Sequence, residues 1–285
     1  MKVIASISEY EGSASASVYS YDRSNIIYMF VGCFLLMLWV IGGKKGFKSA
    51  IGLVFTFICI IYLFLPMLYK GYSPFLSAVV VIILITIVSL YLIDGISKKS
   101  VAAIIGTIIG VIIAGICAAG FGHIAKISGY NVSEVEALVF IASNTNLKVG
   151  GILFAAILIA SLGAVMDVSM SIASTINEIY IHNNKIGKKE LFKSGINVGR
   201  DMMGTMSNTL ILAFTGGSIN TLILNYAYAL RYNQVINIYE VGIEIMQGVS
   251  GSIAIILSVP LVSIISAYLL TFERKKSVNS EICYD

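Results

Sequence analysis

The sequence predicts an all-α membrane protein, a bundle of about seven transmembrane helices with the N-terminus outside and the C-terminus in the cytoplasm. Hydrophobic residues make up 58% of the chain and charged residues only 12%, about half the roughly 25% that soluble domains carry. The apolar runs are continuous and about as long as the roughly 20 residues that a membrane helix needs, whereas barrel strands would alternate. The basic residues gather in alternate loops. Together these observations favour one membrane domain.

Seven apolar runs are long enough to cross a bilayer. A polar segment precedes them, residues 1–24, which we expect to form an exposed tail. Residues 25–272 are expected to form the transmembrane domain, and residues 273–285 a cytoplasmic tail. The expected spans are Asn25–Ile41, Ile51–Tyr69, Phe75–Ile93, Val101–Phe121, Val149–Ile176, Met202–Leu224 and Gly248–Leu270.

The distribution of lysine and arginine predicts the orientation. Of 19 basic residues, 13 follow spans one, three, five and seven, and six lie on the other side. Cytoplasmic loops carry the excess of basic residues. The loops after the odd-numbered spans are therefore expected to be cytoplasmic.

Several residues indicate irregular or closely packed helices. Pro66 and Pro260 lie within spans and are expected to kink them. Gly106 and Gly110 have the small-xxx-small spacing that allows close helix packing. The pair Gly216-Gly217 interrupts the sixth run, which favours either a broken helix, as transporters use around binding sites, or simple close packing.

Two segments on the predicted outer side also stand out. Ser133 followed by Glu136 forms a capping box and predicts a short surface helix that continues to Ile141. Glu244 and Gln247 lie one turn apart at the outer end of the seventh span, where they are expected to line an outer mouth.

A carboxylate interrupts the fifth run, in the stretch GAVMDVSMSIAST from Gly163 to Thr175. An ionised carboxylate in hydrocarbon costs several kcal/mol unless it is paired, hydrated or protonated, so we expect Asp167 to face the bundle interior. On a helix it shares one stripe with the polar residues at i+4, i+7, i+8 and i+11. These are Ser171, Ser174, Thr175 and Glu178.

The sixth run begins with a second stripe of the same spacing, in GRDMMGTMSNTLILAF from Gly199 to Phe214. Its members are Asp201, Thr205, Asn208 and Thr209. Because consecutive spans are antiparallel, we expect the two stripes to face each other as a polar seam, with Asp167 level with Asn208 and Thr209. Arg200 would pair with Asp201 or Glu178, or would face lipid phosphates. The hydroxyls alone are also typical of plain interhelical hydrogen bonds, each contributing about 0.6 kcal/mol.

The stretches GILFAAILIASLGAVMDVSMSIAST and GRDMMGTMSNTLILAFTGGS, on either side of a basic linker, resemble the YibE/F-like family of bacterial multi-span membrane proteins. The similarity is closest from Gly151 to Ser218. The resemblance implies an integral protein of the bacterial cytoplasmic membrane, in a family described as permease-like. It implies no particular substrate.

The first functional expectation is a permease or secondary transporter of an unknown small solute, with the polar seam as its route and the acids as coupling groups. A non-catalytic membrane subunit of an export, assembly or signalling complex is the second. An intramembrane aspartyl-type enzyme is the third and is disfavoured, because Arg200 beside Asp201 favours the ionised acid and hinders two aspartates from sharing one proton.

The expected partners are the lipid bilayer, a small solute, and either a second copy or another membrane protein. No cofactor, metal or catalytic residue is expected, because the chain lacks a phosphate-binding Gly-x4-Gly-Lys-Ser/Thr loop and its two histidines, His123 and His182, stand far apart in the sequence. No nucleic-acid partner is expected either, because the basic residues lie in short loops rather than on one face.

Overall fold

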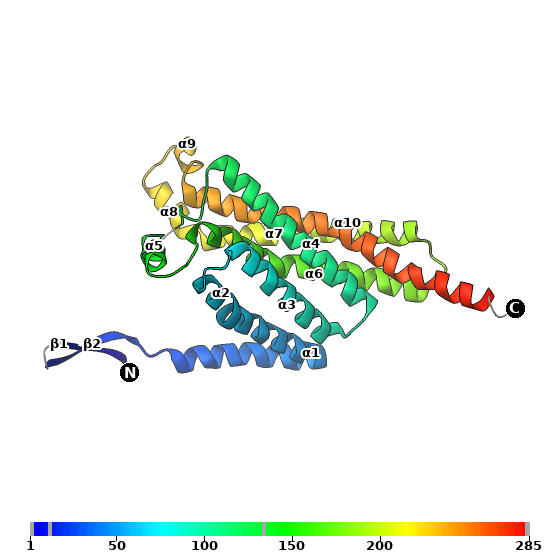
Figure 1. Ribbon diagram of the computed structural model, residues 1–285, viewed down its shortest axis with the longest axis horizontal. Coiled ribbons are helices and arrows are strands. Elements are labelled where there is room, and N and C mark those ends of the chain that lie inside the picture. The colour runs from blue at the N-terminus through cyan, green and yellow to red at the C-terminus, as the bar shows by residue number, and fades with distance from the viewer. Residues whose placement is uncertain (1–2, 11–12, 133–134, 283–285) are drawn as a thin grey trace. The chain divides into compact units, whose positions relative to one another are not determined.

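The protein is described by a computed structural model that covers residues 3–10, 13–132 and 135–282 (Figure 1). The chain divides into two compact units, Met1–Leu53 and Val54–Asp285. Apart from one pair of strands, the regular elements within the described residues are helices. This confirms the predicted all-α class.

The first unit opens with a hairpin where the sequence predicts only a polar tail. Strands β1 (Val3–Tyr10) and β2 (Ser13–Tyr21) pair antiparallel. Their β-branched and aromatic residues favour strands, although the high serine content conceals this signal. After the hairpin, Asp22 accepts a hydrogen bond from the amide of Ser24 (3.1 Å). Hydrogen bonds from Ser24 lower the pKa of the Asp22 carboxyl.

Helix α1 (Ser24–Cys59) is broken at Gly43, which adopts φ 55° and ψ −138°. This backbone conformation is open to glycine and strained for other residues. The chain passes so closely over itself here that a Cβ on Gly46 would overlap the carbonyl oxygen of Leu38. Two helical parts of different direction therefore meet at Gly43.

A π-helical turn, η1 (Ile60–Phe64), precedes the short helix α2 (Leu65–Tyr69). The amide of Leu65 bonds to the carbonyl oxygen of Ile60, five residues back. Pro66 follows directly and has no amide hydrogen to donate. The irregularity predicted at Pro66 therefore takes the form of a widened turn.

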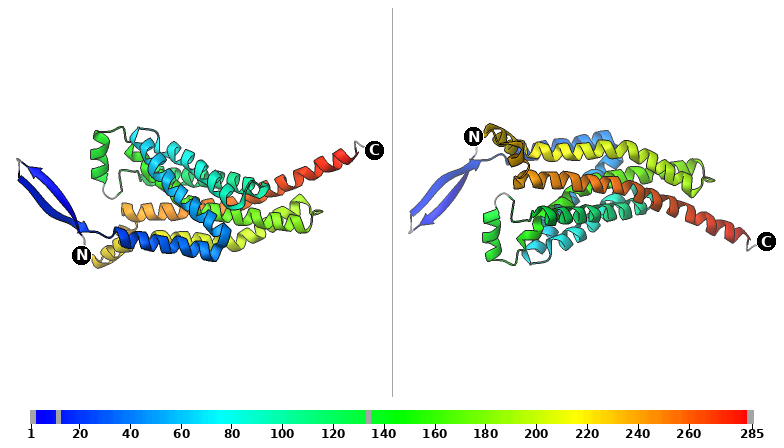
Figure 2. Two further views of the ribbon diagram at one scale, coloured as in Figure 1. Left: turned by 90° about the horizontal axis from the view of Figure 1, so that it is seen from below. Right: turned by 90° about the horizontal axis from the view of Figure 1, so that it is seen from above.

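Five long helices form the core of the second unit. Helices α4 (Lys98–Ala125), α6 (Ile152–His182) and α10 (Tyr239–Ile282) pack against one another. Helix α3 (Pro74–Asp94) packs against α4 and α6, and α7 (Lys188–Gly217) packs mainly against α10. The views in Figure 2 show α7 and α10 side by side.

Small residues allow the close approach of these helices. A Cβ on Gly110 would lie 2.8 Å from Cγ1 of Val165 in α6, and one on Gly106 would overlap Val262 in α10. The small-xxx-small pattern therefore marks real helix contacts, as predicted. At the start of α4, Lys99 donates to Asp94 at 3.2 Å and closes the turn from α3.

The remaining elements are short. They are α5 (Val135–Ser143), the 3-10 turn η2 (Val149–Gly151), α8 (Ile219–Ala227) and α9 (Tyr232–Val235). A helix lies where the capping box predicts one, but Ser133 itself is outside the described residues. Helix α10 continues through Ile282, so most of the expected tail, residues 273–285, extends the last helix.

Within the described residues, five helical segments are long and apolar enough to cross a membrane, and the bent pair α7 and α8 would make a sixth. The first segment, Ser24–Tyr69, contains both of the first two expected spans. The structure therefore supports a multi-pass membrane protein, while the count of seven and the orientation stay predictions.

Candidate functional site

The polar stripe on α6 points away from the core of the bundle. Asp167 and Glu178 are exposed, and Ser171, Ser174 and Thr175 are half-buried. The opposite face supplies the core, where Val165, Val168, Ser169, Ile172, Ala173 and Ile176 are fully buried. The expectation that Asp167 faces the interior is therefore wrong. The buried face of α6 carries apolar and small residues. Turning the helix so that Asp167 lies inside would have moved these residues out of the core.

The stripe on α7 is also turned outward. Asp201, Thr205, Asn208 and Thr209 are all exposed, as is Arg200. The buried positions of α7 are Leu191, Gly195 and Gly199. Small residues on this face let α7 lie close to its neighbours, so packing selects the glycine side of the helix. The two stripes thus form an outer polar surface instead of a seam closed between helices.

Contacts along α6 and α7 show which residues of these two antiparallel helices lie opposite each other. A Cβ on Gly195 would lie 2.6 Å from Cδ1 of Ile176. Near the other end, Leu210 and Ser161 both approach Gly251 of α10. Counting from these contacts places Asp167 opposite Gly204, about one helical turn from the predicted level of Asn208.

The threonines of both stripes are bonded within their own helices. The hydroxyl of Thr175 donates to the carbonyl oxygen of Ser171 (2.9 Å) and that of Thr205 to Asp201 (3.0 Å). Thr209 bonds in the same way to Thr205 (2.9 Å). Within the described residues, no hydrogen bond or ion pair joins one stripe to the other, and Arg200 forms no ion pair with Asp201 or Glu178. The stripes therefore offer acids and hydroxyl acceptors to whatever lies against them.

The two adjacent glycines lie at a break in the helix. Helix α7 ends at Gly217 and α8 begins at Ile219, with a bend of 58° between them. A Cβ on Gly216 or Gly217 would have no neighbour within 4 Å. The structure therefore has a broken helix at Gly216-Gly217. These two glycines do not mark a site of close helix packing, the other expectation for this pair.

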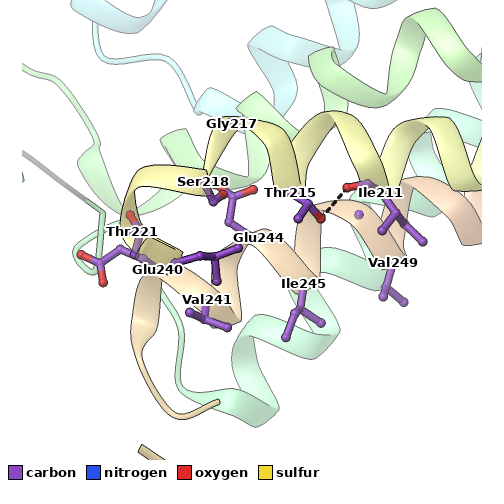
Figure 3. A pocket seen from close by; sticks show the side chains of 12 residues that line it. Ile211, Thr215, Gly217, Ser218, Thr221, Glu240, Val241, Glu244, Ile245 and Val249 are labelled. Atoms are coloured by element: carbon purple, nitrogen blue, oxygen red, sulfur yellow. Dashed lines mark hydrogen bonds between the residues drawn. The ribbon is translucent and has the colours of Figure 1, made fainter. Parts of the chain in front are cut away.

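A pocket of about 430 Å³ opens beside this break (Figure 3). It lies between the end of α7, the start of α8 and the first turns of α10. Its polar side chains are Thr215, Ser218, Thr221, Glu240 and Glu244. Apolar side chains form much of the rest: Ile211, Leu222, Val241, Ile245 and Val249.

Glu244 is the central acid of this pocket. Figure 3 shows its side chain reaching from α10 towards Ser218 at the end of α7, whereas Glu240 lies beside Thr221. One carboxylate oxygen of Glu244, Oε2, is buried and has no hydrogen-bond partner. A buried carboxylate oxygen without a partner costs free energy. Such an atom points to a ligand that completes its bonding.

The hydroxyls near Glu244 are acceptors. Thr215 donates its hydroxyl hydrogen to the carbonyl oxygen of Ile211 (2.8 Å), and Ser218 donates to Phe214 (3.0 Å). Each oxygen keeps lone pairs free. The acids and these hydroxyls therefore present acceptors to the pocket.

Sequence reasoning identified part of this site. Glu244 was expected at an outer mouth, and it lines the pocket, whereas Gln247 is not among the lining residues. Glu240 and Thr221 were missed. The spacing of Glu240 and Glu244, one turn apart where the last long helix begins, is the signal that could have found the second acid.

Metal chemistry has no clear donor set here. Within the described residues, no group of three or more His, Cys, Asp or Glu side chains lies close enough to hold a metal ion. A metal ion bound to Glu240 and Glu244 would need hydroxyl groups and water as its remaining ligands.

One of three comparisons with known proteins found a match. The family described as YibE/F-like protein matches residues 30–272, a range that includes both stripes, the helix break and the pocket. Searches of curated proteins and of solved structures gave no match. Since the family match covers most of the chain, the protein belongs to the YibE/F-like family.

Proposed function

We propose that this protein is a permease that moves a small solute across the membrane. The observation that carries the proposal is the pocket at the bent end of α7, where a carboxylate oxygen of Glu244 is buried without a partner. Discontinuous membrane helices form the substrate sites of many transporters, because their ends offer unpaired backbone groups at membrane depth.

The polar face of α7 supplies a route to that pocket. Thr215 lies 14 residues after Asp201 and on the same side of the helix as Asp201 and Asn208. The stripe therefore runs for about 21 Å along α7. Exposed acids and amides at membrane depth require water or another polar partner. A hydrated path along this face would meet that requirement.

We further propose seven spans. The first helical segment, Ser24–Tyr69, has 46 residues and would measure about 69 Å as one helix, against a hydrocarbon core of about 30 Å. Gly43 divides it, and three lysines directly follow the break: Lys44, Lys45 and Lys48. Both parts, residues 24–42 and 44–69, are then close to the roughly 20 residues of a span.

With seven spans, the charge bias places the N-terminus outside and the C-terminus in the cytoplasm. The pocket then opens near the outer surface, and Asp201 lies towards the cytoplasm. We propose the bacterial cytoplasmic membrane as the location, as the resemblance to the YibE/F-like family implies.

Transport can be tested with the full chain in proteoliposomes loaded with a mixture of small amines, amino acids and inorganic ions. We expect one class to leave faster than from protein-free vesicles, and we expect Asp201→Asn, at the inner end of the proposed route along α7, to reduce that rate several-fold. Glu136→Gln, on the surface helix α5, serves as the matched control. Equal leakage from vesicles with and without protein, for every solute loaded, would overturn the permease.

The second candidate is a non-catalytic subunit of a membrane complex. The outward position of both stripes favours it, because polar groups facing lipid are normally covered by protein. Purification in a mild detergent that yields a stoichiometric second protein, lost on Asp201→Leu, would support this function. A chain that purifies alone and transports alone would exclude it.

A further inference from the structure

We propose that the pocket between the end of α7 and the start of α10 binds a small organic cation with N–H donors, a primary or secondary ammonium compound. The ammonium group would lie against Glu244, and the apolar part against Ile211 and Leu222. The inference rests on the proposed permease and names its solute class, but binding can be measured without any transport.

The charge of the pocket selects a cation. Glu240 and Glu244 are its charged lining residues, and no Lys, Arg or His lines it among the described residues. The C-terminal end of α7 also meets the pocket at Gly217. Such helix ends carry partial negative charge, equivalent to about half an elementary charge.

Helix capping accounts for only one of the two acids. Glu240 lies in the first turn of α10, where the helix dipole stabilises a carboxylate. Glu244 lies a turn further along, and its side chain reaches towards the end of α7 (Figure 3). Its buried oxygen Oε2 has no hydrogen-bond partner. Capping of α10 does not explain this atom. A cationic donor placed between the two helices does.

The hydrogen-bonding character of the lining selects donors. Thr215 and Ser218 already donate their hydroxyl hydrogens to backbone carbonyls, so their oxygens can only accept. An ammonium group with two or three N–H bonds matches such a lining. A carboxylate or phosphate solute would find no donor in Thr215 or Ser218, and the charges of Glu240 and Glu244 would repel it.

Size and composition favour an organic cation over a bare ion. The volume of about 430 Å³ is within the range of small-molecule sites, which are mostly apolar with a few placed polar groups. A metal ion would need more oxygen ligands close together than two acids provide. The lining residues include no aromatic side chain among the described part of the chain, whereas quaternary ammonium sites rely on aromatic cages. The expected ligand is therefore an ammonium compound with N–H bonds, as opposed to a metal ion or a quaternary ammonium compound.

Binding is tested by calorimetry on the purified full chain in detergent, with n-butylammonium as the probe. Tetramethylammonium, n-butanol, Na⁺ and Ca²⁺ are the comparison ligands. We expect saturable binding of n-butylammonium at one site, with tetramethylammonium and n-butanol at least tenfold weaker. Glu244→Gln should weaken the n-butylammonium affinity at least tenfold, and Glu240→Gln should weaken it less.

Two further variants keep the test independent of folding. Glu244→Asp retains the charge and should recover part of the affinity lost in Glu244→Gln, and Glu136→Gln on α5 should bind as the natural chain does. Elution volume and thermal unfolding of each variant show whether it is folded. If Glu244→Gln is folded and binds n-butylammonium normally, the site is overturned.

Each comparison ligand tests a different property of the site. Equal binding of tetramethylammonium would overturn the role of N–H donors, and saturable Ca²⁺ or Na⁺ binding that n-butylammonium does not displace would overturn the organic cation. Binding without flux would support this site and contradict the permease. Flux that Glu244→Gln leaves unchanged would support the permease and contradict this site.

Discussion

The hydroxyl of Thr215 donates to the carbonyl oxygen of Ile211 across one helical turn, at 2.8 Å. This bond fixes the direction of the hydroxyl hydrogen along the helix. The free lone pairs of the oxygen are then available to the pocket, close to the end of the helix at Gly217. A side chain that usually serves as either donor or acceptor thus acts here as an acceptor.

This geometry predicts opposite results for two substitutions at position 215. Thr215→Val keeps the shape and removes the acceptor, and it should weaken n-butylammonium binding at least tenfold, since a hydrogen bond to a charged group contributes about 1.5–3 kcal/mol. Thr215→Ser keeps the acceptor and should bind within about twofold of the natural chain. Calorimetry on both variants makes the comparison. Equal affinities would show that Thr215 does not contact the ligand.

A second prediction concerns the contact of α7 with α10. A Cβ on Gly199 would overlap Cγ1 of Val259 and lie 3.0 Å from its Cγ2. Valine in a helix cannot easily turn aside, because one rotamer dominates. Overpacking costs about 1–3 kcal/mol, more than the roughly 1 kcal/mol that alanine gains in helix propensity. Gly199→Ala should therefore lower the unfolding temperature in detergent.

Gly204 provides the matched control on the same helix. It is exposed, and a Cβ there would meet no atom within 4 Å. Gly204→Ala should leave the unfolding temperature unchanged or raise it. Adding Val259→Ala to Gly199→Ala should restore part of the lost stability. If both single glycine variants melt alike, α7 does not pack on α10 through Gly199.

Much of the fold could be predicted from the sequence, because burial in lipid leaves strong signals. The long apolar runs predicted the helices of the second unit, and Gly106 and Gly110 predicted a real contact face. The pair Gly216-Gly217 predicted the location of the break. Each of these rests on a local property: run length, side-chain size or the absence of a Cβ.

The direction of the polar stripes could not be predicted in the same way. The cost of an acid in hydrocarbon says that Asp167 needs a polar environment, but not whether its own bundle or an outer partner provides it. Val165, Ile172 and Ile176 lie on the other face and are fully buried. Which face of α6 is buried depends on how all the neighbouring helices pack against it. The sequence of one helix does not contain that information.

A third prediction concerns the break at Gly43. If it separates two spans, a cysteine at Lys45 should react with an impermeant maleimide from one side of the membrane, and a cysteine at Lys70 from the other. The four natural cysteines are first replaced by serine or alanine. A single long span would instead bury position 45 near hydrocarbon, where thiolates react poorly, and neither side would label it. Labelling of both positions from one side would exclude two spans here.

A fourth prediction tests what covers the stripe of α7 in the membrane. Asn208 is exposed there, and an amide can donate and accept at once, so two copies of Asn208 could pair across a two-fold axis. Amides at membrane helix interfaces stabilise association by about 0.6–2 kcal/mol. The hydrated route instead predicts that Asn208→Cys, in the cysteine-free background, reacts with a water-soluble maleimide, whereas a second copy on this face would let it form a disulfide upon mild oxidation in native membranes.

Ile116→Cys is the control for that experiment, because Ile116 is exposed on α4 with 61% of its surface accessible and its apolar side chain is suited to lipid. It should give little cross-linked dimer. Equal cross-linking at both positions would indicate random collision and not an interface. If Asn208→Cys stays monomeric yet reacts readily with a water-soluble maleimide, the stripe faces water instead of a second copy. That outcome would favour a hydrated route along α7 over a covered surface.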